Sequence, residues 1–169
     1  MFSLNDKTAL VTGASGGIGA AIAASLHRAG AHVVLSGTRT DALESLASQL
    51  KERVTVMAAD LKEPSAATAL IEKAEAVTGS LDILINNAGF TRDGLLMRMK
   101  DEDWQSVLDV NLTAGFRLTR AALKGMMKRR WGRIIGISSV VGVIGNPGQA
   151  NYVASKAGMI GFTKALAQE

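Results

Sequence analysis

Four polar side chains have the types and the order needed to protonate a carbonyl group. Tyr152 and Lys156 stand four residues apart, so both face the same side of a helix. A phenol in water loses its proton near pH 10, and an ammonium group about 4 Å away makes it a stronger acid by about 4 kcal/mol at an effective dielectric constant near 20. We therefore expect Lys156 to make Tyr152 a usable proton donor. Ser139 precedes Tyr152 and is expected to hydrogen-bond a substrate carbonyl. Asn111, through its side chain or a local break in its helix, is expected to hold a water that relays protons to Lys156.

A glycine-rich loop joins the first apolar run, Thr8–Thr12, to a stretch with helical periodicity, Ile18–Ala29. Backbone N–H groups at a helix N-terminus attract anions, and glycines let a pyrophosphate approach the backbone closely. Dinucleotide-binding folds place this loop between the first strand and the first helix. Gly13, Gly17 and Gly19 are spaced G-x-x-x-G-x-G rather than G-x-G-x-x-G. The loop predicts a dinucleotide cofactor; the structural alternative is a turn that only packs strand on helix.

The end of the second apolar run indicates which nicotinamide cofactor is bound. An acidic residue at this position would bind the adenosine ribose and favour NAD. The sequence instead reads Ser36-Gly37-Thr38-Arg39, and the next carboxylate is Asp41. The guanidinium of Arg39 has the geometry to pair with a 2′-phosphate. We therefore expect NADPH, with a solvated loop arginine as the alternative.

The elements that must position these residues alternate regularly. Short apolar runs typical of strands buried on both faces alternate with amphipathic stretches typical of helices. This order predicts the α/β class, a Rossmann-type doubly wound parallel sheet in one domain over residues 1–169. The expected strands are Thr8–Thr12, His32–Leu35, Val54–Met57, Leu81–Ile85 and Arg133–Ile137. The expected helices are Ile18–Ala29, Asp41–Lys51, Pro64–Thr78, Asp101–Arg130 with a break near Asn111–Gly115, and a last one from Asn151 to Glu169.

Composition argues against several classes of protein. The chain has 169 residues, 47% hydrophobic and 20% charged, which is typical of a globular domain. With no cysteine and two histidines, neither disulfides nor a metal site are expected. No apolar run is long enough for a bilayer, and the N-terminus lacks the order of a signal peptide, so we expect a cytoplasmic protein without a membrane partner. The net charge of +4 does not by itself imply nucleic acid, which we do not expect as a partner.

Together these motifs resemble the short-chain dehydrogenase/reductase family. Taken alone, a Tyr–Lys pair is typical of a helix surface and Ser138-Ser139 of a turn, but Asn, Ser, Tyr and Lys in this order behind a glycine loop match the family's active-site tetrad. The segments Asn86–Met99 and Ser139–Tyr152 resemble the bacterial 3-oxoacyl-[acyl-carrier-protein] reductases of that family, and the resemblance covers Lys7 to Glu169. It implies NADPH-dependent reduction of a 3-oxoacyl thioester on acyl carrier protein, in fatty-acid biosynthesis. The alternatives are reduction of another carbonyl (a CoA thioester, a sugar or a cyclic ketone) and an inactive nucleotide-binding fragment.

The resemblance also implies roles for single residues. It assigns catalysis to Asn111, Ser139, Tyr152 and Lys156, and it assigns Asp60, which alone could simply cap a loop, to the adenine amino group. Gly16 replaces an arginine that relatives often carry beside the cofactor phosphate, which places more of the 2′-phosphate binding on Arg39 and Ser15. The implied cofactor contacts are Gly13, Ser15, Gly17, Ile18, Gly19, Thr38, Arg39, Asp60, Leu61, Asn87, Ala88, Gly89, Tyr152 and Lys156. The implied substrate or carrier contacts are Ser139, Gln149, Arg129 and Arg130.

A basic run without an acid extends from Lys124 to Arg133. Such a run is typical of a solvated helix end, where cations complement the helix dipole. The alternative is a docking surface for an acidic carrier protein, whose approach would be steered by charge. The resemblance favours this second role for Arg129 and Arg130, and it implies a homodimer or homotetramer.

The resemblance also bears on length. Members of the family are longer, whereas this chain stops inside the helix that carries Tyr152 and Lys156. We therefore expect a domain that is incomplete at its C-terminus, truncated after the fifth strand and the following helix. Ile134, Ile135 and Ile137 would then lie at an open apolar sheet edge. Whether a chain of this length is active is left open.

Overall fold

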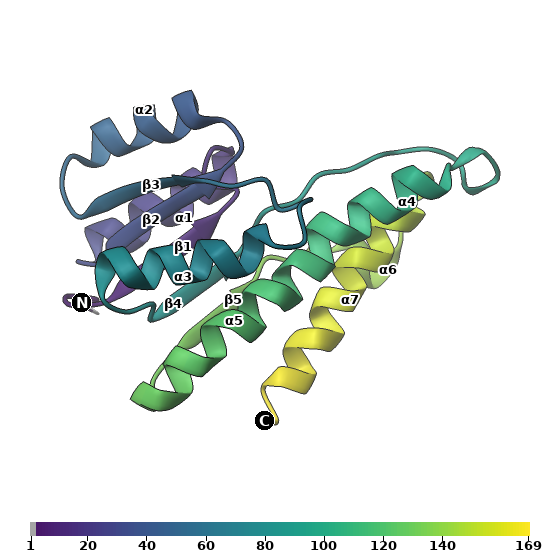
Figure 1. The fold of residues 1–169 in the computed structure, drawn as a ribbon. Helices are drawn as coiled ribbons and strands as arrows, with labels where there is room; N and C mark the ends of the chain where they lie inside the picture. Colours follow the sequence, from purple (N-terminus) through teal and green to yellow (C-terminus); the bar gives the residue numbers. More distant parts are fainter. Residues whose placement is uncertain (1–2) are drawn as a thin grey trace.

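A parallel β-sheet forms the centre of the molecule (Figure 1). The structure, a computed structural model, describes residues 3–169. The sheet has five strands in the order β3-β2-β1-β4-β5, and every pair is parallel. The strands are β1 (Thr8–Thr12), β2 (His32–Gly37), β3 (Val54–Ala58), β4 (Ile83–Asn86) and β5 (Arg133–Gly136). The predicted α/β class and parallel sheet are confirmed.

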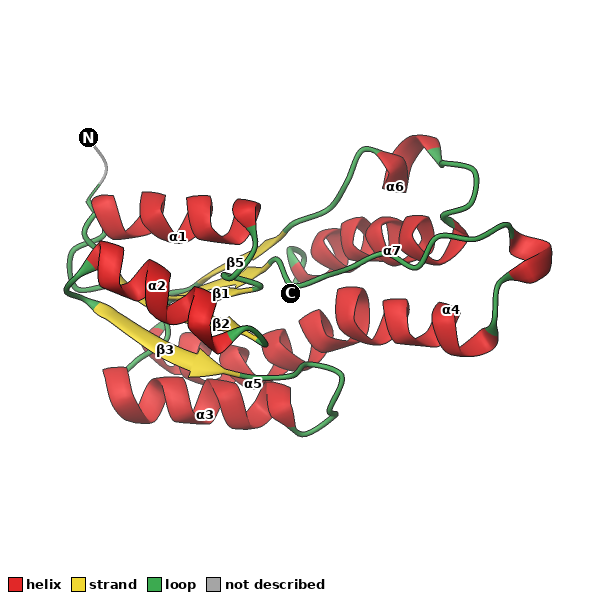
Figure 2. Ribbon diagram, turned by 90° about the horizontal axis from the view of Figure 1, so that it is seen from above, coloured by secondary structure: helices red, strands yellow, loops and turns green. Residues whose placement is uncertain are grey.

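Helices cover both faces of the sheet, as Figure 2 shows. The helices are α1 (Gly17–Arg28), α2 (Thr40–Leu50), α3 (Ala66–Thr78), α4 (Asp101–Leu108), α5 (Ala114–Arg129), α6 (Val141–Ile144) and α7 (Ala150–Leu166). On one face Leu10 of β1 packs in a buried cluster with Ile71 of α3 and Leu118 of α5. On the other face Val11 of β1 shares a cluster with Leu43 of α2. Because successive residues of β1 point to opposite faces and both are buried, the strand reads as an unbroken apolar run.

The long helical region between β4 and β5 is interrupted where the sequence indicated a break. A π-helical turn, η2 (Asp109–Thr113), joins α4 to α5 and carries Asn111. The helix therefore widens at this point and continues. Helix α3 begins at Ala66, two residues later than expected, and the last helix begins at Ala150. Two short elements were not predicted: the 3₁₀ turn η1 (Leu96–Arg98) and α6.

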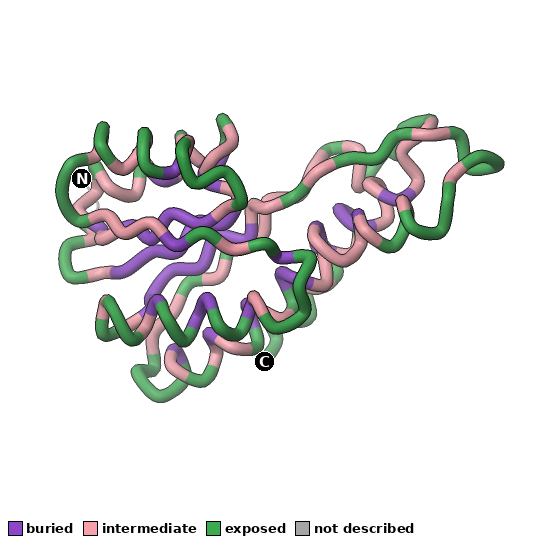
Figure 3. Tube along the Cα trace, turned by 45° about the horizontal axis from the view of Figure 1, so that its top comes forward, coloured by how far each residue is buried: buried purple, intermediate pink, exposed green. Residues whose placement is uncertain are grey.

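An arm made of α4, α6 and the start of α7 projects from the sheet (Figure 3). Buried residues concentrate in the strands and in the helix faces that touch them, whereas the arm is mostly exposed or half-buried. Helix α7 packs on β5 where Gly136 makes room for Met159: a Cβ on Gly136 would lie 2.7 Å from the sulfur of Met159. β5 is one edge of the sheet, and Ile135 is 45% exposed, as expected for an apolar edge. Among residues 3–169, no helix combines the length and apolar character needed to cross a membrane.

Candidate active site

Two adjoining cavities lie at the carboxyl ends of the strands, where open α/β sheets bind their ligands. Their volumes are about 480 Å³ and 330 Å³. They share Gly13, Gly16, Gly89 and Phe90, so they form one continuous cleft. Every residue assigned to the cofactor from the sequence lines one cavity or the other. Ser15, Thr38, Arg39, Asp60, Leu61 and Ala88 line the larger one; Gly17, Ile18, Gly19, Asn87, Tyr152 and Lys156 line the smaller one; Gly13 and Gly89 line both.

The glycine loop folds tightly between β1 and α1. Gly13 has φ +65°, and a Cβ at this position would lie 2.9 Å from the Cα of Ala88. A Cβ on Gly19 would lie 2.3 Å from the carbonyl oxygen of Gly13. Asn87 holds the loop from the other side, since its Nδ2 donates to the carbonyl oxygen of Thr12 at 2.9 Å. Gly16, at the N-cap of α1, has no side-chain oxygen to cap the helix, so the first N–H groups of α1 are left for an anion in the cleft.

The wall of the larger cavity beyond β2 carries positive charge. Arg39 and Lys62 are basic, and Asp60 is acidic. Arg39 Nη2 donates a hydrogen bond to the carbonyl oxygen of Ser15, which places the guanidinium beside the glycine loop. Asp60 Oδ1 accepts a hydrogen bond from the N–H of Lys62 at 3.0 Å. One carboxylate oxygen of Asp60 is therefore used to cap its own loop, the alternative that the sequence left open for it.

Tyr152 and Lys156 reach the smaller cavity together from the first two turns of α7. Lys156 is only 5% exposed, and its Nζ donates to the carbonyl oxygen of Ile137 at 2.7 Å. Its Nζ lies 5.6 Å from the centroid of the Tyr152 ring. Burial lowers the pKa of the Lys156 ammonium below its ordinary value. A buried cation is thus held beside the phenol at the point where the cleft meets β5.

The other two members of the expected tetrad lie outside the cavity walls. Ser138 rather than Ser139 lines the smaller cavity, and the Ser138 hydroxyl donates to the carbonyl oxygen of Lys156 at 2.9 Å. The Ser139 hydroxyl accepts a long hydrogen bond, 3.4 Å, from the N–H of Val141. Asn111 is 2% exposed, and both its Oδ1 and its Nδ2 are hydrogen-bonded to protein groups. The side chain is thus already engaged, and a water held at the break in the helix stays a prediction.

The expected substrate and carrier contacts are dispersed. Gln149 bridges two loops of the arm, since its Nε2 donates to Asp93 Oδ2 at 3.1 Å and its Oε1 accepts from Asn146 Nδ2 at 2.9 Å. Arg129 and Arg130 lie at the end of α5, beside the amino ends of the strands, which is the opposite end of the sheet from the cleft. Arg130 follows α5 in the left-handed conformation, with φ 53°.

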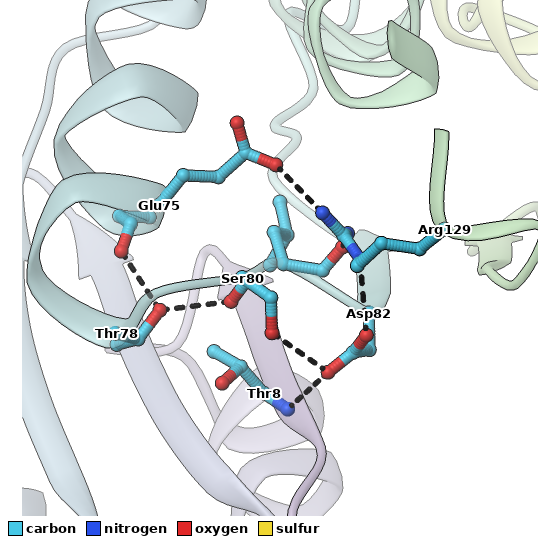
Figure 4. Close-up of polar contacts among 8 residues, drawn as sticks. Thr8, Glu75, Thr78, Ser80, Asp82 and Arg129 are labelled. Carbon is cyan, nitrogen blue, oxygen red and sulfur yellow. Dashed lines mark hydrogen bonds and ion pairs between the residues drawn. The ribbon is translucent and has the colours of Figure 1, made fainter. Parts of the chain in front are cut away.

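Arg129 forms ion pairs within the protein, and its expected role in carrier docking stays a prediction. Its Nε lies 3.7 Å from Asp82 Oδ1, and its Nη1 lies 3.6 Å from Glu75 Oε1 (Figure 4). Its Nη2 donates to the carbonyl oxygen of Leu81. Asp82 is 4% exposed and also accepts from the N–H of Thr8 at 3.0 Å. Arg129 therefore neutralises a buried carboxylate, while its own side chain is 32% exposed.

Sequence reasoning missed several residues around Tyr152. Ser138 and Phe90 line the cleft, and Asn151 and Ser155 are both 0% exposed beside Tyr152. Ser155 follows Tyr152 by three residues, so helical spacing alone indicates that the two share a face. Asn151 and Phe90 carry no comparable signal, because Asn151 bonds to Arg92 and Phe90 bonds to Asn111 across a large separation in the sequence.

Comparison with known proteins agrees with this geometry. Residues 7–169 match the family model described as short chain dehydrogenase. The chain is 62% identical over 169 residues to nodulation protein G of Rhizobium sp. (strain N33), covering all of this chain and 69% of that protein. It is 54% identical over 169 residues to the 3-oxoacyl-[acyl-carrier-protein] reductase FabG of Rickettsia felis, covering all of this chain and 68% of that protein. It is 50% identical over 167 residues to the FabG of Escherichia coli (strain K12), covering 99% of this chain and 68% of that protein.

Proposed function

Because the chain belongs to the short chain dehydrogenase family, we propose that it uses NADPH to reduce the keto group of a 3-oxoacyl thioester carried by acyl carrier protein. The observation that carries the proposal is that Tyr152 and Lys156 line the same cleft as the glycine loop. The Tyr152 phenol would thereby stand beside a dinucleotide bound at the glycine loop. The relatives named 3-oxoacyl-[acyl-carrier-protein] reductase support the thioester as the substrate and fatty-acid biosynthesis as the setting.

The cleft fits a dinucleotide phosphate. Side chains are excluded at Gly13 and Gly19, where a Cβ would collide with backbone atoms, so a pyrophosphate can approach the loop closely. Gly13, Gly17 and Gly19 with the N-terminus of α1 would hold the pyrophosphate, and Arg39 and Ser15 would hold a 2′-phosphate. Bound NADPH would supply the hydride. Asp60 keeps one carboxylate oxygen outside its loop hydrogen bond for the adenine amino group.

The chain's own residues would supply the proton and orient the substrate carbonyl. Tyr152 would donate its phenolic proton to the carbonyl oxygen as negative charge develops there. The buried Lys156 ammonium stabilises the phenolate that remains, and its N–H groups would also bind a ribose hydroxyl. The Ser139 hydroxyl, whose hydrogen bond to Val141 is long, would turn toward the substrate carbonyl. A water held by the π-helical turn at Asn111 would return a proton to Lys156.

A second candidate is reduction of a different carbonyl substrate. Nodulation protein G of Rhizobium sp. (strain N33) is 62% identical to this chain, and its name states no substrate. The same acid and the same cofactor would then act on a CoA thioester, a sugar or a cyclic ketone. The proposed partner, acyl carrier protein, is thus the part of the assignment that most needs a direct test.

Loss of NADPH absorbance with acetoacetyl thioesters tests both candidates. Acetoacetyl groups are offered on acyl carrier protein, on CoA and on a short pantetheine mimic, with Tyr152→Phe as the inactive control. We expect the highest kcat/KM with the carrier-bound thioester and at least a 100-fold loss in Tyr152→Phe. A higher kcat/KM with the CoA thioester than with the carrier-bound one would favour the second candidate, as would turnover of cyclic ketones or sugars, offered in the same assay, without turnover of any thioester. Absence of turnover by folded, NADPH-bound protein would reject both.

We also propose that the chain forms a homo-oligomer through its long helices. Phe116 and Met127 on α5 are 42% and 71% exposed, which are large apolar surfaces for a soluble helix. Multi-angle light scattering is expected to give the mass of a dimer or tetramer. A monomer at micromolar concentration would refute this.

A further inference from the structure

The backbone of Tyr152 is held on both sides by buried side chains that the proposed mechanism does not use. Its N–H donates to Asn151 Oδ1 at 2.7 Å, and its carbonyl oxygen accepts from the Ser155 hydroxyl, also at 2.7 Å. Asn151 and Ser155 are both 0% exposed. Neither lines a cavity of the cleft, so neither is placed to touch a substrate or cofactor.

The direction of each hydrogen bond at Ser155 is fixed. A serine hydroxyl has one proton, and here it is donated to the Tyr152 carbonyl. The oxygen must therefore act as the acceptor toward Asn111 Nδ2, which lies 3.2 Å away. Ser155 thus connects the π-helical turn to the helix of Tyr152 in one orientation only.

Asn111 also hydrogen-bonds to a residue in the wall of the cleft. Its Nδ2 also donates to the carbonyl oxygen of Phe90 at 3.0 Å, and its Oδ1 accepts from the N–H of Phe90 at 3.0 Å. A Cβ on Gly89 would lie 3.1 Å from that Oδ1, so the loop lies close against Asn111. Phe90 lines both cavities. A continuous set of hydrogen bonds therefore runs from the cleft wall through Asn111 and Ser155 to Tyr152.

Asn151 makes a second connection to the same loop. Its Nδ2 donates to the carbonyl oxygen of Arg92 at 3.0 Å, and to that of Asp103 in α4 at 3.3 Å. Arg92 stands two residues after Phe90 in the loop that follows β4. The two polar groups of the Tyr152 backbone are thus tied, through separate side chains, to one segment, residues 90–92.

We propose that Ser155 and Asn151 are positioning residues that set where the Tyr152 phenol lies relative to Lys156 and the cleft. Tyr152, Ser155 and Lys156 share one face of α7, so a contact that fixes the rotation of the helix at Ser155 also fixes both functional side chains. The role in turnover rests on the proposed function; the placement of Tyr152 does not. A misplacement of a reacting group by about 1 Å costs up to 100-fold in rate.

Ser155→Ala and Ser155→Thr form the test pair, with Thr163→Val as the matched control. Ser155→Thr keeps the hydroxyl, whereas Thr163→Val removes a comparable hydroxyl-to-carbonyl bond, from Thr163 to Met159, on the same helix. We expect Ser155→Ala to lower kcat about tenfold with the KM for NADPH and thioester unchanged, and Ser155→Thr to recover most of kcat. Thr163→Val should behave like the unsubstituted protein.

A spectroscopic readout separates this inference from the proposed function. Tyr152 is the single tyrosine of the chain, so protein labelled with 3-fluorotyrosine gives one ¹⁹F resonance. We expect Ser155→Ala to shift or broaden that resonance, and Ser155→Thr and Thr163→Val to leave it in place. This measurement needs neither substrate nor turnover, so it decides the placement of Tyr152 even if the chain reduces no thioester.

Two results would overturn the assignment. One is an unchanged resonance and an unchanged kcat in Ser155→Ala. The other is an equal loss in Ser155→Ala and Ser155→Thr, which would mean that the site responds to any change of packing. If Ser155→Ala does not fold, Ser155→Cys, which keeps the volume but donates only weakly, takes its place with the same expected direction.

Discussion

Lys156 is a cation that the fold holds almost out of water. Burial lowers its pKa, so the native protein releases this proton at a lower pH than the unfolded chain, whose lysine titrates near 10.5. Between the pKa of Lys156 in the native protein and the higher pKa of the same lysine in the unfolded chain, the unfolded chain binds more protons. The free energy of unfolding therefore rises with pH in this range. Lys156→Met removes the titrating group, so its stability should lack this rise. It should also lower kcat/KM at least 100-fold.

Urea denaturation at neutral and at alkaline pH measures the effect. The stability of the unsubstituted protein relative to Lys156→Met should increase as the pH approaches 10.5. Lys164→Met, which replaces an exposed lysine on the same helix, should keep the pH dependence of the unsubstituted protein. If the free energies of unfolding of the unsubstituted protein and Lys156→Met differ by a constant amount across this pH range, burial does not lower the pKa of Lys156.

Arg39 is the residue expected to distinguish NADPH from NADH. Its guanidinium lies at the rim of the larger cavity, held by the carbonyl of Ser15. A charge-assisted hydrogen bond contributes about 1.5–3 kcal/mol, so Arg39→Ala should raise the Kd for NADPH about 10- to 100-fold. Fluorescence titration with NADPH and NADH measures this, and the NADH affinity should stay unchanged. If the Kd for NADPH and the Kd for NADH rise equally, Arg39 stabilises the glycine loop rather than binding the 2′-phosphate.

At the scale of elements, the glycine loop offers two neighbouring positions with opposite expectations. A Cβ at Gly19 would meet backbone at 2.3 Å, whereas a Cβ at Gly17 would have nothing within 4 Å. Gly19→Ala should therefore lower the free energy of unfolding by about 1–3 kcal/mol, since β1, α1 and the loop must separate to admit the methyl group. Gly17→Ala should change it by less than about 0.5 kcal/mol. Urea denaturation without cofactor measures both, and equal stability of the two variants would contradict the tight packing at Gly19.

The sequence predicts these elements to different degrees, for physical reasons. Apolar runs locate the five strands because parallel strands are buried on both faces, as β1 is. The sequence predicts a break near Asn111, but a single π-helical turn shifts the helical period too briefly to be distinguished from a gap between helices. Asn111 hydrogen-bonds to Phe90 and Ser155, which lie 21 and 44 positions away in the sequence. A residue pattern within a short window cannot predict such contacts.

At the scale of the whole molecule, the tertiary structure determines which groups the charge of Arg129 contacts. In the sequence it belongs to a basic run, and nothing distinguishes it from Lys128 or Arg130. In the fold it joins the end of α5 to Glu75 of α3 and to Asp82 just before β4 (Figure 4). Asp82 in turn holds the N–H of Thr8 in β1. One arginine thus links both strands and both helices on this side of the sheet.

Arg129→Ala should therefore destabilise the fold and leave the cleft intact. Removing the guanidinium leaves the buried Asp82 carboxylate without its cation, a loss of several kcal/mol for a fully buried pair. Since the Arg129 side chain is 32% exposed, solvent screening reduces the expected loss to about 2 kcal/mol. Lys128→Ala, which removes the same charge from an exposed neighbour, should cost less than about 0.5 kcal/mol.

Urea denaturation and carrier kinetics together separate this structural role from docking. Arg129→Ala should unfold at lower urea than Lys128→Ala, and its Kd for NADPH should be unchanged because Arg129 lies at the opposite end of the strands from the cleft. Its KM for the carrier-bound thioester should change no more than its KM for the CoA thioester. A selective rise in the KM for the carrier-bound thioester, with stability intact, would instead show that Arg129 faces the partner, because only a docking residue acts through the carrier alone.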